Sequence, residues 1–166
     1  MNAKLLVQQI QRYHNRTLLI DTNLLLLFFV GSFRPDLIKS FKRMSEYSLQ
    51  DFEILEALLL KFKRFSTTPH ILTEVSNFMG QRGEPERSEM RCYLAKSIQA
   101  WHETNASSKT LALTSCFPQF GLTDAAIADL VPGTCLVLTD DDPLAGLLKK
   151  RGSDVIRFSD LQKGCR

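Results

Sequence analysis

The sequence predicts an α/β fold in which a mainly parallel sheet of about five strands is flanked by helices. Short, compact apolar runs alternate with longer amphipathic segments, as strands alternate with helices in such folds. Two of the short runs, residues 17–20 and 134–139, are largely apolar and stop at aspartates, which is typical of strands covered on both faces. The 166 residues, of which 44% are hydrophobic, suit one domain spanning residues 1–166.

In the first part of the chain, helix ends can be predicted from individual residues. Asp21 or Thr22 can cap a helix that follows the first strand, and Gly31 is expected to end it. The elements expected here are a short helix in residues 1–14, the strand 17–20, a helix to about residue 30, a helical insert at 31–67, and a short strand at the end of that insert, 64–67.

The second part begins with a clear helix signal. Thr68 can cap a helix that has Pro69 at its first position, and Gly80 is expected to end it. The elements expected after it are an amphipathic stretch at 84–106, a weak strand at 111–113, a helix at 122–130 that Pro132 and Gly133 stop, the strand 134–139, a helix at 143–150 and a strand at 154–158.

Charge and cysteine content limit the function classes. The formal net charge of +3 is mildly basic and compatible with a nucleic-acid partner. The four cysteines, Cys92, Cys116, Cys135 and Cys165, lie far apart and form no CxxC pair, so a zinc site or a redox pair is not indicated. We predict reduced, mostly buried thiols and a cytoplasmic protein.

The apolar run from Leu18 to Val30 raises the question of a membrane. It has about half the length needed to span a bilayer, and it contains Asp21 and Asn23. It also lacks the small-residue cleavage site of a signal peptide. We interpret it as a buried strand followed by a buried helix, and we predict no membrane partner.

Carboxylates directly follow two of the predicted strands. Asp21 ends the first, and Asp140, Asp141 and Asp142 follow the strand 134–139. Ligands of open parallel sheets bind beyond the carboxyl ends of the strands, so these acids converge if the two strands are neighbours. Like charges held close together need a counter-charge. A hard divalent cation with oxygen ligands, such as Mg²⁺ or Mn²⁺, supplies one.

Each acid also has a simpler explanation. Asp21 can cap the next helix, and the three aspartates can form a solvated loop before a helix that begins at Pro143. Glu74, at the border of the apolar face of its helix, can be an exposed glutamate. Asp124 in a first helical turn favours the helix dipole. The metal-site interpretation therefore depends on the whole set of acids occurring together.

Four segments of the chain carry a family resemblance. The residues LLIDTNLLL (18–26), ILTEVSNF (71–78), GLTDAAIADL (121–130) and LVLTDDDPLA (136–145) resemble, in order and spacing, the four motifs of PIN domains. PIN domains are small nucleases that include the VapC-like toxins of bacterial toxin–antitoxin pairs. The resemblance covers about residues 17–158. It implies a Mg²⁺- or Mn²⁺-dependent endoribonuclease, either the toxin of such a pair or an RNA-processing enzyme, that hydrolyses RNA phosphodiester bonds.

The resemblance also implies a role for each motif residue. Asp21, Glu74 and Asp124 match the first three catalytic acids, and Asp141 matches the fourth, with Asp140 as its rival. The aspartates would bind the metal, and Glu74 would orient water or hold a second ion. The polar positions that support the site by hydrogen bonding are matched by Thr22, Asn23 and Thr139. An antitoxin protein and a homodimer are the partners that the family implies, and the insert at 31–67 is longer than in compact toxins.

An acidic site needs a basic rim to hold a phosphate backbone. The residues predicted to bind RNA are Arg64, Arg82 and Lys42, chosen from a wider basic set that adds Lys39, Arg43, Lys61, Lys63, Arg87 and Arg91. For any one of these side chains taken alone, a solvated helix face is the simpler explanation.

Two other functions are compatible with acids at strand ends. An aspartyl-phosphate-type phosphatase also places Asp beside Mg²⁺, but it needs a second Asp two residues after the first, where this chain has Asn23. A catalytically silent PIN-fold interaction module would keep the fold and lose turnover. The intact acids argue against this second alternative.

Overall fold

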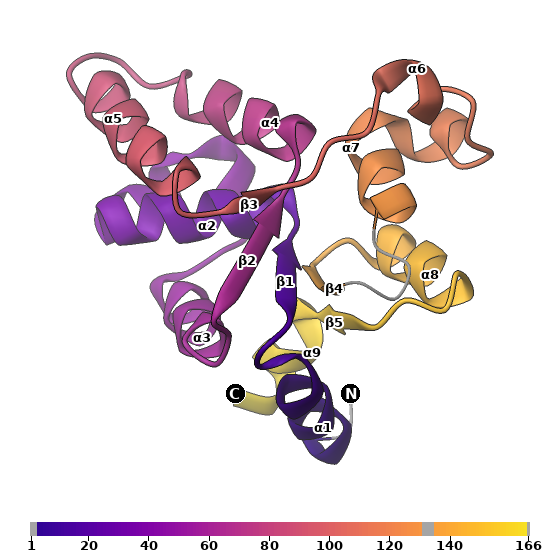
Figure 1. Ribbon diagram of the computed structural model, residues 1–166. Coiled ribbons are helices and arrows are strands. Elements are labelled where there is room, and N and C mark those ends of the chain that lie inside the picture. Colours follow the sequence, from indigo (N-terminus) through magenta and orange to yellow (C-terminus); the bar gives the residue numbers. More distant parts are fainter. Residues whose placement is uncertain (1–2, 131–134, 166) are drawn as a thin grey trace.

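The computed structural model describes residues 3–130 and 135–165 (Figure 1). These residues form a five-stranded, all-parallel sheet with the strand order β3-β2-β1-β4-β5. The strands are β1 (Thr17–Ile20), β2 (Arg64–Thr67), β3 (His102–Glu103), β4 (Cys135–Thr139) and β5 (Val155–Arg157). The predicted α/β fold with a parallel sheet of about five strands is therefore confirmed.

Helices cover both faces of the sheet. Figure 1 has α2, α3 and α5 on one side and α7 and α8 on the other, while α4 contacts both α2 and α7 above the strand ends. The α-helices are α1 (Ala3–Tyr13), α2 (Thr22–Phe33), α3 (Leu49–Leu59), α4 (Pro69–Met79), α5 (Glu86–Ile98), α6 (Ser108–Leu111), α7 (Phe117–Leu130), α8 (Asp142–Lys150) and α9 (Phe158–Cys165), and two 3₁₀ helices, η1 (Pro35–Ser40) and η2 (Lys42–Met44), follow α2.

The two strands that end in aspartates are neighbours at the centre of the sheet. β1 pairs with β4 from Thr17↔Cys135 to Ile20↔Leu138. The side chains of Leu18, Leu19 and Ile20 are essentially inaccessible to solvent, which explains why this short strand is apolar throughout. No helix in the described part of the chain is long and apolar enough to cross a bilayer.

Gly31 does not end its helix as predicted, because α2 continues to Phe33. A Cβ at position 31 would collide with the ring of Phe52 in α3. The glycine therefore allows α2 and α3 to approach closely. Beyond it, the insert at 31–67 contains two short 3₁₀ helices before α3, where Ser48 and Asp51 form a capping box.

The third strand lies elsewhere than predicted. Residues 108–111 form α6, and Leu113 is 84% exposed, so the expected strand at 111–113 is wrong. The strand is instead the two-residue β3, whose exposed His102 and Glu103 give no apolar signal. The chain also forms α9 from Phe158, where a strand residue was expected.

The remaining sequence predictions concern helix starts, thiols and one turn. Thr68 caps α4 with Pro69 in its first turn, as predicted. Among the cysteines whose side chains are described, Cys116 and Cys135 are buried and Cys92 is exposed. The expected turn at Pro132 and Gly133, with Thr134, lies outside the described residues.

Candidate metal-binding site

The carboxyl ends of β1 and β4 bring two of the predicted acids together. The backbone N–H of Asp21 donates to the carbonyl of Leu138 (3.0 Å), which continues the pairing of the two strands by one residue. The Thr139 hydroxyl donates to Asp21 Oδ2 (2.7 Å) and accepts from the backbone N–H of Asp141 (3.0 Å). Thr139, fully buried, thus connects the two aspartates, as expected of a supporting residue.

Both aspartates also cap helices. Asp21 Oδ1 accepts from the Thr22 N–H (2.6 Å) at the start of α2, and Asp141 Oδ1 accepts from the Leu144 N–H (2.7 Å) at the start of α8. Asp21 is therefore a helix cap, as its simpler explanation expected, and Asp141 is a helix cap as well. Capping uses one carboxylate oxygen of each residue. It does not exclude a cation at the remaining lone pairs.

Glu74 and Asp124 reach the same region from two helices that pack together. Glu74 lies half-buried on α4, and its Oε1 accepts from the Thr123 hydroxyl (2.5 Å). Asp124, also half-buried, follows in α7. α7 is kinked at Gly121, whose φ of 75° and ψ of −170° belong to a region open essentially to glycine. The kink starts a new helical segment at residue 122, where the sequence predicted a helix to begin.

The pKa values show which acids influence one another. The pKa of Asp124 is raised to about 7, first by burial and then by the negative charges of Asp21, Asp141 and Glu74. Burial is also the main cause that raises the pKa of Asp21 to about 6, against the opposing hydrogen bonds from Thr139 and Thr22. Repulsion from Asp140 and Asp141 adds to this shift. Asp21, Glu74 and Asp141 thus all repel Asp124, and Asp141 also repels Asp21. We call these four residues the strand-end acids.

Asp140 has different surroundings from the strand-end acids. Its carboxylate accepts hydrogen bonds from the Tyr47 hydroxyl and from Asn23 Nδ2 (3.5 Å). Arg43 Nε in turn donates to Asn23 Oδ1 (2.9 Å). Burial raises the pKa of Asp140, while Asn23 and Arg43 oppose the shift. The third aspartate, Asp142, is exposed and paired with Arg157 (3.0 Å).

The donor chemistry of the strand-end acids fits a hard divalent cation. All four offer only oxygen, the ligand that Mg²⁺ and Mn²⁺ prefer. Next to Asp21, the buried Thr22 hydroxyl finds no hydrogen-bond partner within the described ranges. As the side chains stand, however, the described residues contain no group of three or more acids, histidines or cysteines that could hold a metal ion. The carboxylates would therefore have to turn toward a shared ion.

The three residues predicted to bind RNA are not brought together. Arg64 begins β2, at the opposite edge of the sheet from the acids. Arg82 is engaged by Glu86, which accepts from its Nε (3.0 Å) and Nη2 (2.7 Å), and its guanidinium lies over the ring of Phe41. Lys42 is exposed on η2, beside Arg43.

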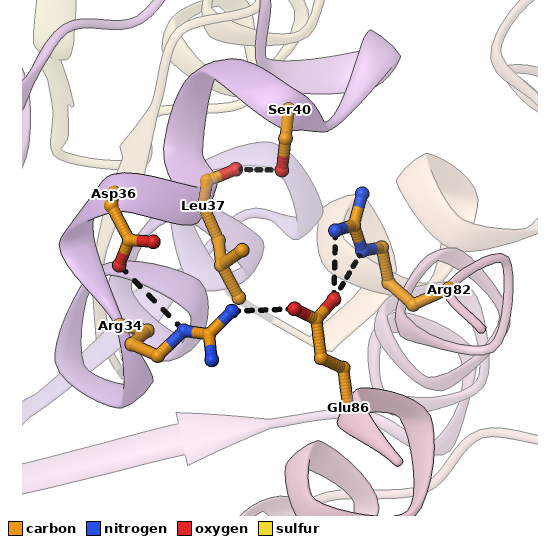
Figure 2. A network of polar contacts seen from close by, with 6 residues as sticks. All are labelled: Arg34, Asp36, Leu37, Ser40, Arg82 and Glu86. Carbon is orange, nitrogen blue, oxygen red and sulfur yellow. Dashed lines mark hydrogen bonds and ion pairs between the residues drawn. The ribbon is translucent and has the colours of Figure 1, made fainter. Parts of the chain in front are cut away.

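Figure 2 shows the polar contacts that engage Arg82. Glu86 bridges Arg82 and Arg34. The Nη2 of Arg34 donates to Glu86 Oε1 (2.5 Å), and Arg34 also forms an ion pair with Asp36 (3.6 Å). We call Arg34, Arg82 and Glu86 the bridging network. It joins the end of α2 to the start of α5, so these arginines serve packing between helices.

Sequence reasoning missed three residues at the site. Arg43 stood only within the wider basic set, although it is the cation whose charge acts on Asp140. Tyr47 is buried, and the sequence alone does not distinguish it from an aromatic core residue, but its hydroxyl donates to the Asp140 carboxylate. Thr123 directly precedes Asp124 within the quoted motif GLTDAAIADL, and this adjacency was the available signal for its contact with Glu74.

No model of a protein family matches the chain, and no curated protein matches it.

Proposed function

We propose that the chain is a divalent-metal-dependent endoribonuclease that uses the strand-end acids to hold Mg²⁺ or Mn²⁺. The observation that carries the proposal is the raised pKa of Asp124, which three other carboxylates repel at the carboxyl end of a parallel sheet. Acids that repel one another in this way favour a cation among them. The motif resemblance to PIN domains supports RNA as the substrate, whether the enzyme acts as a toxin with an antitoxin partner or processes RNA.

In this proposal Asp21, Asp124 and Asp141 bind the metal ion, because they act on one another electrostatically and offer oxygens only. Asp141 is favoured over Asp140 as the fourth acid, since Asp140 is engaged by Tyr47 and Asn23. Glu74, oriented by Thr123, would position the attacking water. A bound divalent cation would supply the Lewis acidity that activates water and stabilises the leaving oxygen.

The test is RNA cleavage by the purified protein in Mg²⁺ or Mn²⁺, compared between the wild type, Asp21→Asn and Asp129→Asn. Asp129 is a matched control, because it is an exposed aspartate on α7 and, within the described residues, makes no hydrogen bond or ion pair with the strand-end acids. We expect Asp21→Asn to lose at least about 100-fold in cleavage rate, and Asp129→Asn to retain full activity.

Three results would overturn the proposal. Equal activity of the wild type and Asp21→Asn would assign the cleavage to a contaminant. A wild type that cleaves no RNA would instead favour the silent interaction module. A trapped phosphoryl-enzyme would indicate the aspartyl-phosphate chemistry.

A further inference from the structure

A pocket of about 560 Å³ adjoins the candidate metal site on the side of the insert. Its volume lies within the range of sites that bind small organic ligands, roughly 300–1,000 Å³. The lining is polar and comes from three places: Asn23 and Asp140 next to the strand-end acids, Arg43, Glu46 and Tyr47 from the insert, and Ser159 and Gln162 from α9.

Arg43 is the one cation among these lining residues, and two contacts orient its side chain. Its Nε donates to Asn23 Oδ1 (2.9 Å), and its guanidinium lies 5.2 Å from the centre of the Phe78 ring. Within the described residues, no hydrogen bond or ion pair occupies its two terminal amino groups. A guanidinium held in this way offers a planar pair of donors, the geometry that suits a phosphate.

The other charged groups of the pocket narrow the ligand class. Glu46 and Asp140 are acids, so the pocket combines one cation with several hydrogen-bond acceptors. A nucleotide matches this combination, since it has one anionic phosphate and base-edge N–H donors. A peptide rich in acidic residues does not match, because Glu46 and Asp140 would repel it.

We propose that this pocket binds one nucleotide of single-stranded RNA next to the cleavage site, with Arg43 holding its phosphate. The inference rests on the proposed nuclease function, because the pocket shares Asp140 and Asn23 with the region of the strand-end acids. It also assigns a role to the long insert, which supplies Arg43, Glu46 and Tyr47.

The test measures binding separately from cleavage. A short fluorescein-labelled single-stranded RNA is titrated with protein in Ca²⁺ in place of Mg²⁺, and its anisotropy is followed between about 50 and 200 mM salt. The variants are Arg43→Gln, Arg43→Lys and the control Arg16→Gln. Arg16 also lies over an aromatic ring, that of Tyr13 (5.6 Å), but it precedes β1 at the opposite edge of the sheet.

We expect Arg43→Gln to weaken RNA binding about tenfold, the size of one lost charged hydrogen-bond contact, and to lower the slope of log K against log salt by about 0.7. Arg43→Lys, which keeps the charge without the planar pair of donors, should fall between wild type and Arg43→Gln. Arg16→Gln should bind like the wild type. In cleavage assays Arg43→Gln should raise KM more than it lowers kcat.

The outcomes separate the two proposals. If Arg43→Gln binds RNA as well as Arg16→Gln does, the pocket inference is wrong, whatever the cleavage result. It is also wrong if the wild type binds no RNA, or if polyglutamate displaces the RNA at equal charge concentration. If the wild type binds RNA through Arg43 but cleaves none in Mg²⁺ or Mn²⁺, the nuclease proposal fails and the pocket remains an RNA-binding site.

Discussion

Glu86 and Asp124 are both carboxylates on helices, yet their surroundings move their pKa values in opposite directions. In the bridging network, the hydrogen bond from Arg82 is the main cause that lowers the pKa of Glu86, and Arg34 adds to it. Among the strand-end acids, burial and three neighbouring carboxylates raise the pKa of Asp124 to about 7. The bridging network therefore stabilises the ionised form of Glu86. The surroundings of the strand-end acids destabilise the ionised forms of Asp21 and Asp124.

This difference separates acids that support the fold from acids that cost stability. The rise in the pKa of Asp21 from 3.8 to about 6 corresponds to roughly 3 kcal/mol of unfavourable interaction for its ionised form. Acids with strongly raised pKa values cluster at functional sites, where a bound ligand offsets the loss of stability. The predictions below test whether the two groups of acids respond to metal, pH and substitution in opposite ways.

The largest expected effect is stabilisation by a divalent cation above neutral pH. Asp21 and Asp124 have folded pKa values of about 6 and 7, above the ordinary value of 3.8. Between about pH 4 and pH 7 the folded state thus binds more protons than the unfolded state, so stability falls as pH rises and the full penalty remains above pH 7. Glu86 acts in the opposite sense, because its lowered pKa gives stability that is lost on acidification.

Mg²⁺ at 100 times its Kd should add about 2.7 kcal/mol to the free energy of unfolding at pH 8, and much less at pH 5, where Asp21 and Asp124 are largely protonated. Thermal denaturation at both pH values measures this, with NaCl of equal ionic strength as the control. An equal rise in Tm at pH 5 and pH 8, or none at pH 8, would contradict the prediction.

Removing the hydroxyl that connects Asp21 with Asp141 should reduce activity next most strongly. Thr139→Val keeps the shape of a fully buried residue but deletes both hydrogen bonds. We expect cleavage to fall about 10–100-fold, as when residues that orient metal ligands are changed. Thr73→Val, which alters an exposed hydroxyl bonded within α4, is the control. Full activity of Thr139→Val would show that the hydroxyl does not orient the acids.

Neutralising one of the strand-end acids should stabilise the protein. Asp124→Asn removes a charge that three other carboxylates repel. We expect Tm at pH 8 to rise by about 2–4 °C, the change that about 1 kcal/mol gives in a domain of this size, because solvent screens part of the repulsion at this half-exposed residue. The control Asp129→Asn should leave Tm unchanged. A fall in Tm of Asp124→Asn would contradict this account of the site.

The smallest effect is expected in the bridging network, and its sign is opposite. Glu86→Gln removes a carboxylate that two arginines hold, so Tm should fall slightly at pH 8 and less in high salt, which screens exposed ion pairs. Glu89→Gln, an exposed acid on the same helix, is the control. A rise in Tm for Glu86→Gln would remove the contrast between the two regions.

Local patterns were enough to predict the elements that carry the strand-end acids. β1 and β4 are short runs of largely buried side chains, and an aspartate directly follows each of them. The sequence alone therefore marks the carboxyl end of each strand. The cap at Thr68 and the helical start at residue 122 likewise depend on adjacent residues.

The features that escaped prediction depend on contacts between distant parts of the chain. β3 is two exposed residues that pair through their backbone with β2, and no side-chain pattern marks such an edge strand. Gly31 allows α2 to approach Phe52, a contact between two helices. Arg43 and Tyr47 reach Asn23 and Asp140 only because the insert folds back over the strand ends.

The most direct test of the central claim is calorimetric titration of Mn²⁺ into the wild type, Asp21→Asn and Asp129→Asn at pH 8. If the strand-end acids hold a divalent cation, the wild type and Asp129→Asn bind Mn²⁺ alike, and Asp21→Asn loses the binding. If the wild type binds no Mn²⁺ at millimolar concentration, or if Asp21→Asn binds it equally well, these acids are helix caps and loop residues and the metal site does not exist.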